Sequence, residues 1–131
     1  MNLVIIESPL KGAVPSWAPR WLAPTFERIG RWRNKRCARA CMRDSLARGE
    51  APYASHLLYD QRGILNDADD AQRVLGMNAG SAWSRVGATR AFYVDRGFSG
   101  GMMRGRAEAE AFRQAIAFRS LKWSPTTEPK I

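Results

Sequence analysis

The sequence has few of the residues that form disulfides or metal centres. Its 131 residues include two cysteines and one histidine. Cys37 and Cys41 lie four positions apart in a predicted helix, where the two side chains share a face but the backbone geometry suits a disulfide poorly. We therefore expect reduced thiols in a core or a groove. A zinc site needs more ligands than two thiols and His56, so we predict no metal and no other cofactor.

Long apolar runs are also missing. No run approaches the roughly 20 apolar residues that a membrane span requires, and the apolar start of the chain reaches Glu7 too early for a signal peptide. We therefore expect a soluble, cytoplasmic protein that has no membrane partner. The length and the 45% hydrophobic content suit one domain with a single core.

Acidic residues are in deficit, since 12 of them face 21 basic residues and leave a net charge of +9. A surplus of this size attracts phosphate groups. Many arginines lie between positions 20 and 48, close to Trp17, Trp21 and Trp32. Basic residues interleaved with aromatic ones are one way to bind nucleic acid, and an amphipathic helix with a solvated basic face is the alternative interpretation.

The order of apolar runs and turn residues predicts an α/β domain. Short apolar runs predict strands at 3–6, 51–58, 88–94 and 116–123, and amphipathic spacing predicts helices at about 31–48, 67–85 and 102–115. The proline- and tryptophan-rich segment 13–33 is typical of an insertion, and 124–131 of a frayed tail. Strands that alternate with helices favour a small, Rossmann-like, three-layer fold with a mainly parallel sheet of four or five strands.

Polar or flexible loops follow the first three predicted strands. The carboxyl ends of parallel strands meet at one sheet edge, which is where open α/β sheets bind ligands. The loop after the third strand is the most suggestive, because its glycines let the backbone approach a ligand and its helix directs amide groups to the same place. The candidate ligand-binding residues are Ser8, Lys11, Gly12, His56, Tyr59, Asp60, Asp95, Ser99, Gly100, Gly101 and Met102.

Three of the polar candidates have structural alternatives that the sequence leaves open. His56 could donate a proton or hydrogen-bond a base, and it could equally be a satisfied, half-buried histidine. Asp60 could bind a ribose hydroxyl or cap a turn, and Asp95 could contact ligand or belong to an ordinary turn. Glu108 and Glu110 are two positions apart on a predicted helix and face different ways, so they are not a catalytic carboxylate pair.

Four segments carry a resemblance to a known family: ESPLKG at 7–12, RACMRDSLARGEAP at 39–52, SHLLY at 55–59 and SGGM at 99–102. They resemble small proteins of the nucleoside 2-deoxyribosyltransferase-like group, which belongs to the SLOG superfamily of Rossmann-like nucleotide-binding domains and includes phage and bacterial members. The resemblance covers about residues 1–12 and 34–123. It implies a nucleotide ligand and a dimer or larger homo-oligomer, as well as the host-cell cytoplasm if a phage encodes the chain.

Enzymes of that superfamily hydrolyse or exchange the N-glycosidic bond of deoxynucleosides or their monophosphates, and their last loop resembles Ser-x-Gly-x-Gly-x-Glu. The serine binds phosphate, and the glutamate attacks the anomeric carbon. Here Ser99 and Gly101 match the pattern, Met103 replaces the second glycine, and Gly105 stands where the nucleophile is expected. The carboxylate of the motif is therefore missing, and Glu108 lies almost one helical turn further on.

These observations favour a nucleotide-binding protein that does not turn its ligand over, such as a sensor or a sponge for a nucleotide signal. Ser8, Lys11 and the 99–101 loop would hold phosphate, and His56, Tyr59 and Asp95 would face the base and the sugar. One alternative is an N-glycosidase or deoxyribosyltransferase that uses Glu108 or Asp95 as its carboxylate. Another is a nucleic-acid-binding module that acts through the Trp- and Arg-rich segment.

Overall fold

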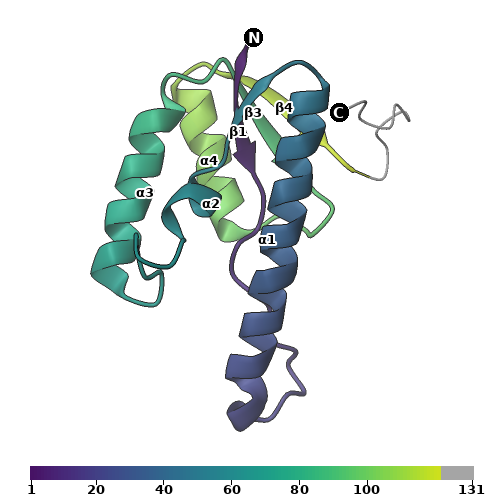
Figure 1. Ribbon diagram of the computed structural model, residues 1–131, viewed down its shortest axis with the longest axis vertical. Coiled ribbons are helices and arrows are strands. Elements are labelled where there is room, and N and C mark those ends of the chain that lie inside the picture. Colours follow the sequence, from purple (N-terminus) through teal and green to yellow (C-terminus); the bar gives the residue numbers. More distant parts are fainter. Residues whose placement is uncertain (122–131) are drawn as a thin grey trace.

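The computed structural model describes residues 1–121 and contains one sheet of four parallel strands in the order β2-β1-β3-β4 (Figure 1). The strands are β1 (Leu3–Glu7), β2 (Ala51–Tyr53), β3 (Thr89–Tyr93) and β4 (Ala115–Arg119). The helices are the 3-10 helix η1 (Arg20–Leu22), α1 (Ala23–Ala47), α2 (Ser55–Tyr59), α3 (Asp70–Ser84) and α4 (Gly100–Ala111).

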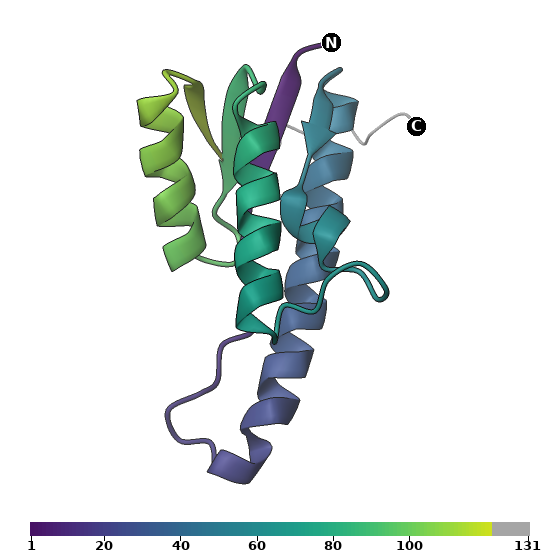
Figure 2. The ribbon, with the colours of Figure 1, turned by 90° about the vertical axis from the view of Figure 1, so that its left-hand side faces the viewer.

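The helices form two layers, one on each face of the sheet. α1 leads from β1 to β2 and covers one face, whereas α3 and α4 lie together on the other (Figure 1, Figure 2). This division follows from the strand order, because right-handed crossovers place their helices on opposite faces when the chain reverses its direction across the sheet. The reversal occurs at β1. The predicted small, Rossmann-like α/β fold is therefore confirmed, with four strands.

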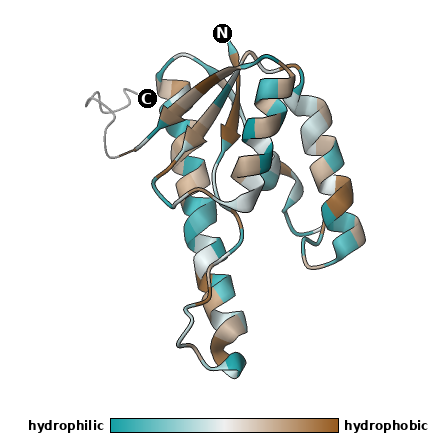
Figure 3. Cartoon of the chain, turned by 180° about the vertical axis from the view of Figure 1, so that it is seen from behind, coloured by the Kyte–Doolittle hydropathy of each residue, from teal (hydrophilic) through white to brown (hydrophobic). Residues whose placement is uncertain are grey.

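The main core lies between the sheet and α1. Val4 and Ile6 of β1 pack there with Cys41 of α1 and with Ala91 and Tyr93 of β3, and each of these side chains is at most 2% exposed. The middle strands are mostly apolar in the hydropathy view (Figure 3). The apolar runs that predicted β1 and β3 are thus the two central strands, as buried parallel strands require. Both cysteines are free thiols.

The second strand is shorter than predicted. It ends at Tyr53, and residues 55–58, which we expected to be its second half, form α2 together with Tyr59, which we expected in the following loop. β2 is the edge strand, where Pro52 is tolerated although it lacks an N–H group. The amides of Leu57 and Leu58 donate to the carbonyl of Ala54, so the apolar residues reach the core from a helical turn. The prediction that His56 ends a strand was wrong, because a short apolar run suits either element.

The first helix is longer than predicted. α1 starts at Ala23 rather than near residue 31, so about half of the expected insertion, from residue 23 to residue 33, is its N-terminal part. Pro24 stands in the first turn, where its missing N–H group costs no hydrogen bond and its fixed φ favours the helix. A proline that we took as a loop signal therefore marks a helix start.

The remaining boundaries shift by a few residues. α3 continues through Gly80, where we considered a break, and this glycine is buried against Ser55. α4 begins at Gly100 and ends at Ala111, earlier than the predicted 102–115. β4 ends at Arg119. The end of its predicted range, 122–123, and the predicted tail, 124–131, lie outside the described residues.

Gly12 packs directly on α1. A Cβ atom on Gly12 would lie 2.3 Å from the carbonyl oxygen of Glu27, and one on Gly30 would lie 2.6 Å from the Cα of Gly12. Real Cβ atoms do not approach this closely, so both positions need glycine for the loop to lie against the helix. Asn34 holds the same loop, because its side-chain amide donates to the carbonyls of Leu10 and Lys11.

Candidate functional site

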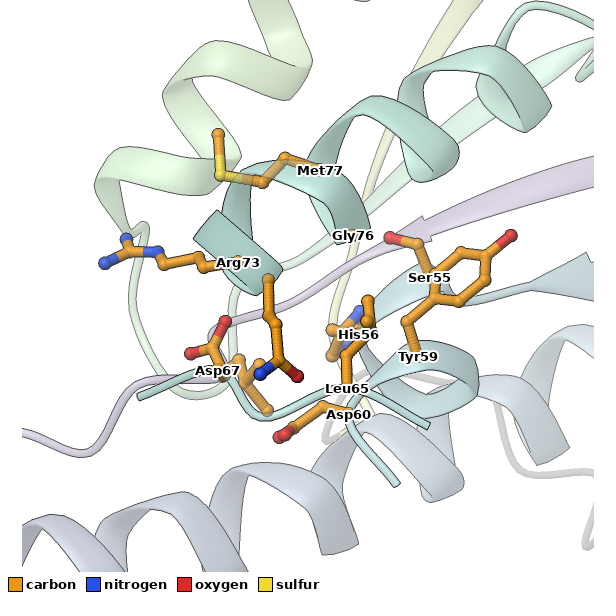
Figure 4. Close-up of a pocket in the computed structure, with 11 residues that line it drawn as sticks. Ser55, His56, Tyr59, Asp60, Leu65, Asp67, Arg73, Gly76 and Met77 are labelled. Atoms are coloured by element: carbon orange, nitrogen blue, oxygen red, sulfur yellow. The ribbon is translucent and has the colours of Figure 1, made fainter. Parts of the chain in front are cut away.

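The strand order reverses at β1, and the loops after β1 and β3 leave the carboxyl edge of the sheet side by side. In open α/β sheets such a switch point forms the ligand crevice. A pocket of about 120 Å³ opens next to it, between α2, α3 and the loop that joins them (Figure 4). It is lined by Leu10, Ser55, His56, Tyr59, Asp60, Leu65, Asp67, Gln72, Arg73, Gly76 and Met77.

His56 of α2 is fixed by a hydrogen bond to the end of β1. Its Nε2 atom lies 2.9 Å from the Oγ atom of Ser8, which is itself only 7% exposed. Burial lowers the pKa of His56 to about 4, against an ordinary value of 6.5. The ring is therefore neutral near pH 7, with one nitrogen bound to Ser8 and the other free to accept from or donate to a ligand. This geometry suits a hydrogen-bonding role better than a charged one.

Asp60 follows α2 and is held by two cations of α1. Its carboxylate accepts from Arg31 at 2.9 Å and lies 3.2 Å from the Nζ atom of Lys35. Arg31 also bridges to Asp67 at 3.2 Å, so one guanidinium ties both ends of the 60–67 loop to α1. The sequence did not reveal Arg31, because the pairing depends on how α1 lies against this loop. The structure thus gives Asp60 a loop-fixing role in addition to its place in the pocket wall.

Arg73 of α3 places a positive charge at the pocket. One turn further along α3, Met77 accepts from Arg104 of α4 at 3.4 Å, which joins the two helices on this side of the sheet. Figure 4 shows the Arg73 side chain directed away from the other lining residues. Nothing in the local sequence marked Arg73, since its position depends on the packing of α3 against α4.

The loop after β3 ends at Ser99, which caps α4. Its hydroxyl accepts from the amide of Met102, whose side chain is buried. Gly100 and Gly101 form the exposed first turn, and space for a Cβ is open at Gly100. The backbone there is accessible to a ligand, as the sequence predicted, but Ser99 already has a structural partner.

The structure brings only part of the predicted ligand set together. Ser8, His56, Tyr59 and Asp60 meet at the pocket, whereas Gly100 and Gly101 lie in the exposed first turn of α4. The predicted residues that lie elsewhere are Lys11, which is exposed, Gly12, which packs on α1, Met102, which is buried in α4, and Asp95.

Asp95 and Glu108, the two carboxylates suggested for catalysis, are both engaged. Asp95 accepts from the Ser120 hydroxyl at 2.8 Å and from the Leu121 amide at 2.9 Å, so it holds the chain that follows β4. Glu108 accepts from Arg90 at 2.9 Å and also hydrogen-bonds Ser81 of α3. The contacts with Arg90 and Ser81 therefore account for the carboxylate of Glu108, and the residues that follow β4 account for that of Asp95.

A third carboxylate, that of Glu7, stands beside Gly105. A Cβ on Gly105 would lie 2.6 Å from the Oε1 atom of Glu7, so this carboxylate fills the space of a side chain at position 105. Burial raises the pKa of Glu7 to about 7, and the nearby Glu108 adds to this effect while Arg90, 3.3 Å away, opposes it. Its side chain is 20% exposed. Sequence reasoning assigned it no role, although its place at the end of a buried strand was a usable signal.

Two further features, a metal-binding cluster and a membrane-spanning helix, are absent from residues 1–121. No three His, Cys, Asp or Glu side chains come close enough together there to hold a metal ion. None of the helices in this range combines the length and the apolar character that crossing a membrane requires.

Residues 2–119, nearly the whole chain, match a family described as a domain of unknown function (DUF7768). No curated protein and no solved structure matches the chain. The match spans all four strands of the sheet and every residue of the pocket. The chain therefore belongs to the DUF7768 family.

Proposed function

We propose that the protein binds a nucleotide or a nucleotide-derived signal at the carboxyl edge of its sheet and does not turn it over, as a sensor or a sponge would. The observation that carries this proposal is the pocket beside the strand reversal, with neutral His56 and the Arg73 cation among the residues that line it. The resemblance to nucleoside 2-deoxyribosyltransferase-like proteins supports the same ligand class.

The chemistry of the pocket suits the two ends of a nucleotide. Leu65, Met77 and the ring of Tyr59 offer apolar surface to a base, and His56 offers a neutral hydrogen-bonding nitrogen. The 120 Å³ of the pocket is less than the about 300–1,000 Å³ of a complete small-molecule site, so it accommodates one part of the ligand. A phosphate would then lie outside it, between Arg73 and the amides of α4.

Replacement of Arg73 by alanine is expected to weaken binding of a nucleoside monophosphate about 10- to 150-fold, because a charge-assisted hydrogen bond contributes about 1.5–3 kcal/mol. The affinity for the nucleoside without phosphate should change little. The measurement is the thermal shift of the full chain with a panel of deoxynucleoside monophosphates, cyclic nucleotides and ADP-ribose derivatives, followed by calorimetric titration of the best ligand.

The matched control is Arg85→Ala, which removes an exposed arginine about 18 Å further along the axis of the same helix. It should leave nucleotide affinity unchanged. Equal losses in the two variants would mean that only net charge matters. A panel in which no nucleotide raises the melting temperature would contradict the proposed function itself.

A second candidate function, cleavage of an N-glycosidic bond, is favoured by the placement of Glu7 against Gly105. In that reaction a carboxylate oxygen of Glu7 bonds to the anomeric carbon as the bond to the base breaks, and the base takes a proton from water. A second water then hydrolyses the glycosyl ester and releases the sugar. A pKa of about 7 leaves much of Glu7 ionised at neutral pH, as a nucleophile requires.

If the protein is such an enzyme, Glu7→Gln is expected to abolish the release of free base and to spare nucleotide binding, because glutamine keeps the shape but cannot form the ester. Release is followed by chromatography. Glu110→Gln, an exposed change on α4, is the control. The same assay on Glu108→Gln and Asp95→Asn tests the other two carboxylates. Release that survives all three changes at Glu7, Glu108 and Asp95 would exclude this chemistry, and no release from the native protein would leave the binding function alone.

A further inference from the structure

The basic charge of the protein is concentrated in one projecting part, which we call the basic arm and define as residues 11–43. It holds nine lysines and arginines and a single acid, Glu27, so it has a net charge of +8 out of the +9 of the whole chain. Figure 1 and Figure 2 show that the N-terminal half of α1, with the loop before it, extends well beyond the sheet and the other helices. Apart from Arg31 and Lys35, which pair with Asp60 at the pocket, the basic side chains of the arm are exposed to solvent.

The arginines of the arm form a stripe along the solvent side of α1. Arg28, Trp32, Arg36, Arg39 and Arg43 recur every three or four residues, which puts them on one side of the helix, and all five are exposed. The buried residues of α1, Asn34, Ala38, Cys41 and Ser45, face the opposite way. The stripe is about 22 Å long at 1.5 Å per residue.

This stripe is not neutralised within the part of the chain that the structure describes. None of its arginines makes an ion pair with an acid of residues 1–121, whereas Arg31 and Lys35, on another side of the same helix, are paired with Asp60. Holding so many like charges on one helix is unfavourable. A partner that supplies negative charge would relieve this repulsion.

Exposed tryptophans accompany the arginines. The exposed fractions are 73% for Trp17, 76% for Trp21 and 56% for Trp32. The guanidinium carbon of Arg36 lies 4.9 Å from the ring centre of Trp32, so a cation and an aromatic face are presented together. Indole rings of this size are normally buried, and they lose favourable burial energy when they are left in water.

We propose that the basic arm binds single-stranded nucleic acid, with the arginine stripe on the phosphates and the tryptophans stacked on bases. A polyanion matches the +8 charge, and only a single strand exposes base faces for stacking. A second copy of the chain is a poorer occupant of this face, because pairing two arms would bring two charges of +8 together. This surface is distinct from the pocket, so the inference does not depend on whether the proposed function is correct.

The test is fluorescence anisotropy of a labelled 20-nucleotide oligo(dT) titrated with the full chain at several salt concentrations. Arg36→Gln with Arg43→Gln is expected to reduce the slope of log affinity against log salt by about 1.4, since each phosphate contact on a single strand contributes about 0.7. Trp32→Ala is expected to weaken binding about tenfold, because stacking contributes about 1–3 kcal/mol per base. The control, Arg85→Gln with Arg106→Gln, removes two exposed arginines outside the arm and should change neither quantity.

Four results would overturn the inference. The first is the absence of oligonucleotide binding by the native protein at low salt. The second is an equal loss of affinity in the arm variant and in the control, which would mean that overall charge alone attracts the strand. The third is binding of a duplex as tight as that of oligo(dT) and insensitive to Trp32→Ala, which would exclude stacking. The fourth result comes from sedimentation. It is a native dimer that Trp32→Ala abolishes, in a protein that has no affinity for the oligonucleotide.

Discussion

Replacing Arg90 by methionine is expected to lower the free energy of unfolding by about 3–5 kcal/mol, because removal of one partner from a buried ion pair leaves uncompensated charge behind. Arg90 lies on the central strand β3 and is fully buried. Its Nη1 atom donates to Glu108 at 2.9 Å, to the Gly105 carbonyl at 3.0 Å and to Glu7 at 3.3 Å. The change would leave two carboxylates side by side under α4 without a cation. Urea unfolding at pH 7 measures the effect.

Two companion variants separate the charge from the lost packing. Adding Glu7→Gln and Glu108→Gln to Arg90→Met should recover most of the stability, because no buried charge then remains. Arg106→Met breaks the exposed pair with Glu110 and should cost no more than about 1 kcal/mol, as surface ion pairs do. If Arg90→Met proved as mild as Arg106→Met, the buried cluster would not stabilise the fold.

The pH dependence of stability is expected to be weak in the native protein between pH 4.5 and 6.5 and steep in two variants. Glu7 has a pKa of about 7 when folded, above its ordinary 4.5, so its contribution is fully present below pH 4.5 and is lost as the pH rises towards 7. His56 has a pKa of about 4 when folded, below its ordinary 6.5, so its contribution is present above pH 6.5 and is lost as the pH falls towards 4. Over this range the two effects oppose each other.

Each substitution removes one of the two effects. Relative to the native protein, Glu7→Gln should gain stability with rising pH by about 1.4 kcal/mol per pH unit, the value for one proton. Relative to the native protein, His56→Asn should lose stability with rising pH at the same rate. Urea unfolding at pH 5.0, 5.5, 6.0 and 6.5 gives both slopes, and the difference from the native protein cancels the groups that all three share. Parallel curves for the three proteins would show that neither group titrates as its burial requires.

Much of the fold was predictable because its signals are local. The apolar runs at 3–6 and 88–94 predicted buried strands, and the glycines and prolines between them placed the crossovers. The least reliable part was the stretch 51–59, where the apolar residues of β2 continue into α2 without a break in the pattern. The helical start at Ala23 was missed because prolines were interpreted as loop signals, although Pro24 is compatible with a first turn.

The candidate site was predictable only as a location. Parallel topology placed the loops after the first three strands at one edge, and Ser8, His56, Tyr59 and Asp60 do meet there. The prediction could not supply Arg73, which comes from the middle of the sequence and reaches the site through the packing of α3 on α4. Nor could it assign Asp95 to the end of β4, because that contact joins residues 25 positions apart.

The sequence by itself determined the strand–helix order, the central strands and the concentration of charge in residues 11–43, because each depends on residues that are neighbours in the chain. Only the tertiary structure decided that Arg90 is buried between two carboxylates and that Glu7 takes the space beside Gly105. The physical reason is that burial and charge pairing depend on which distant segments approach one another. A charged residue looks the same in a sequence whether water or a carboxylate surrounds it.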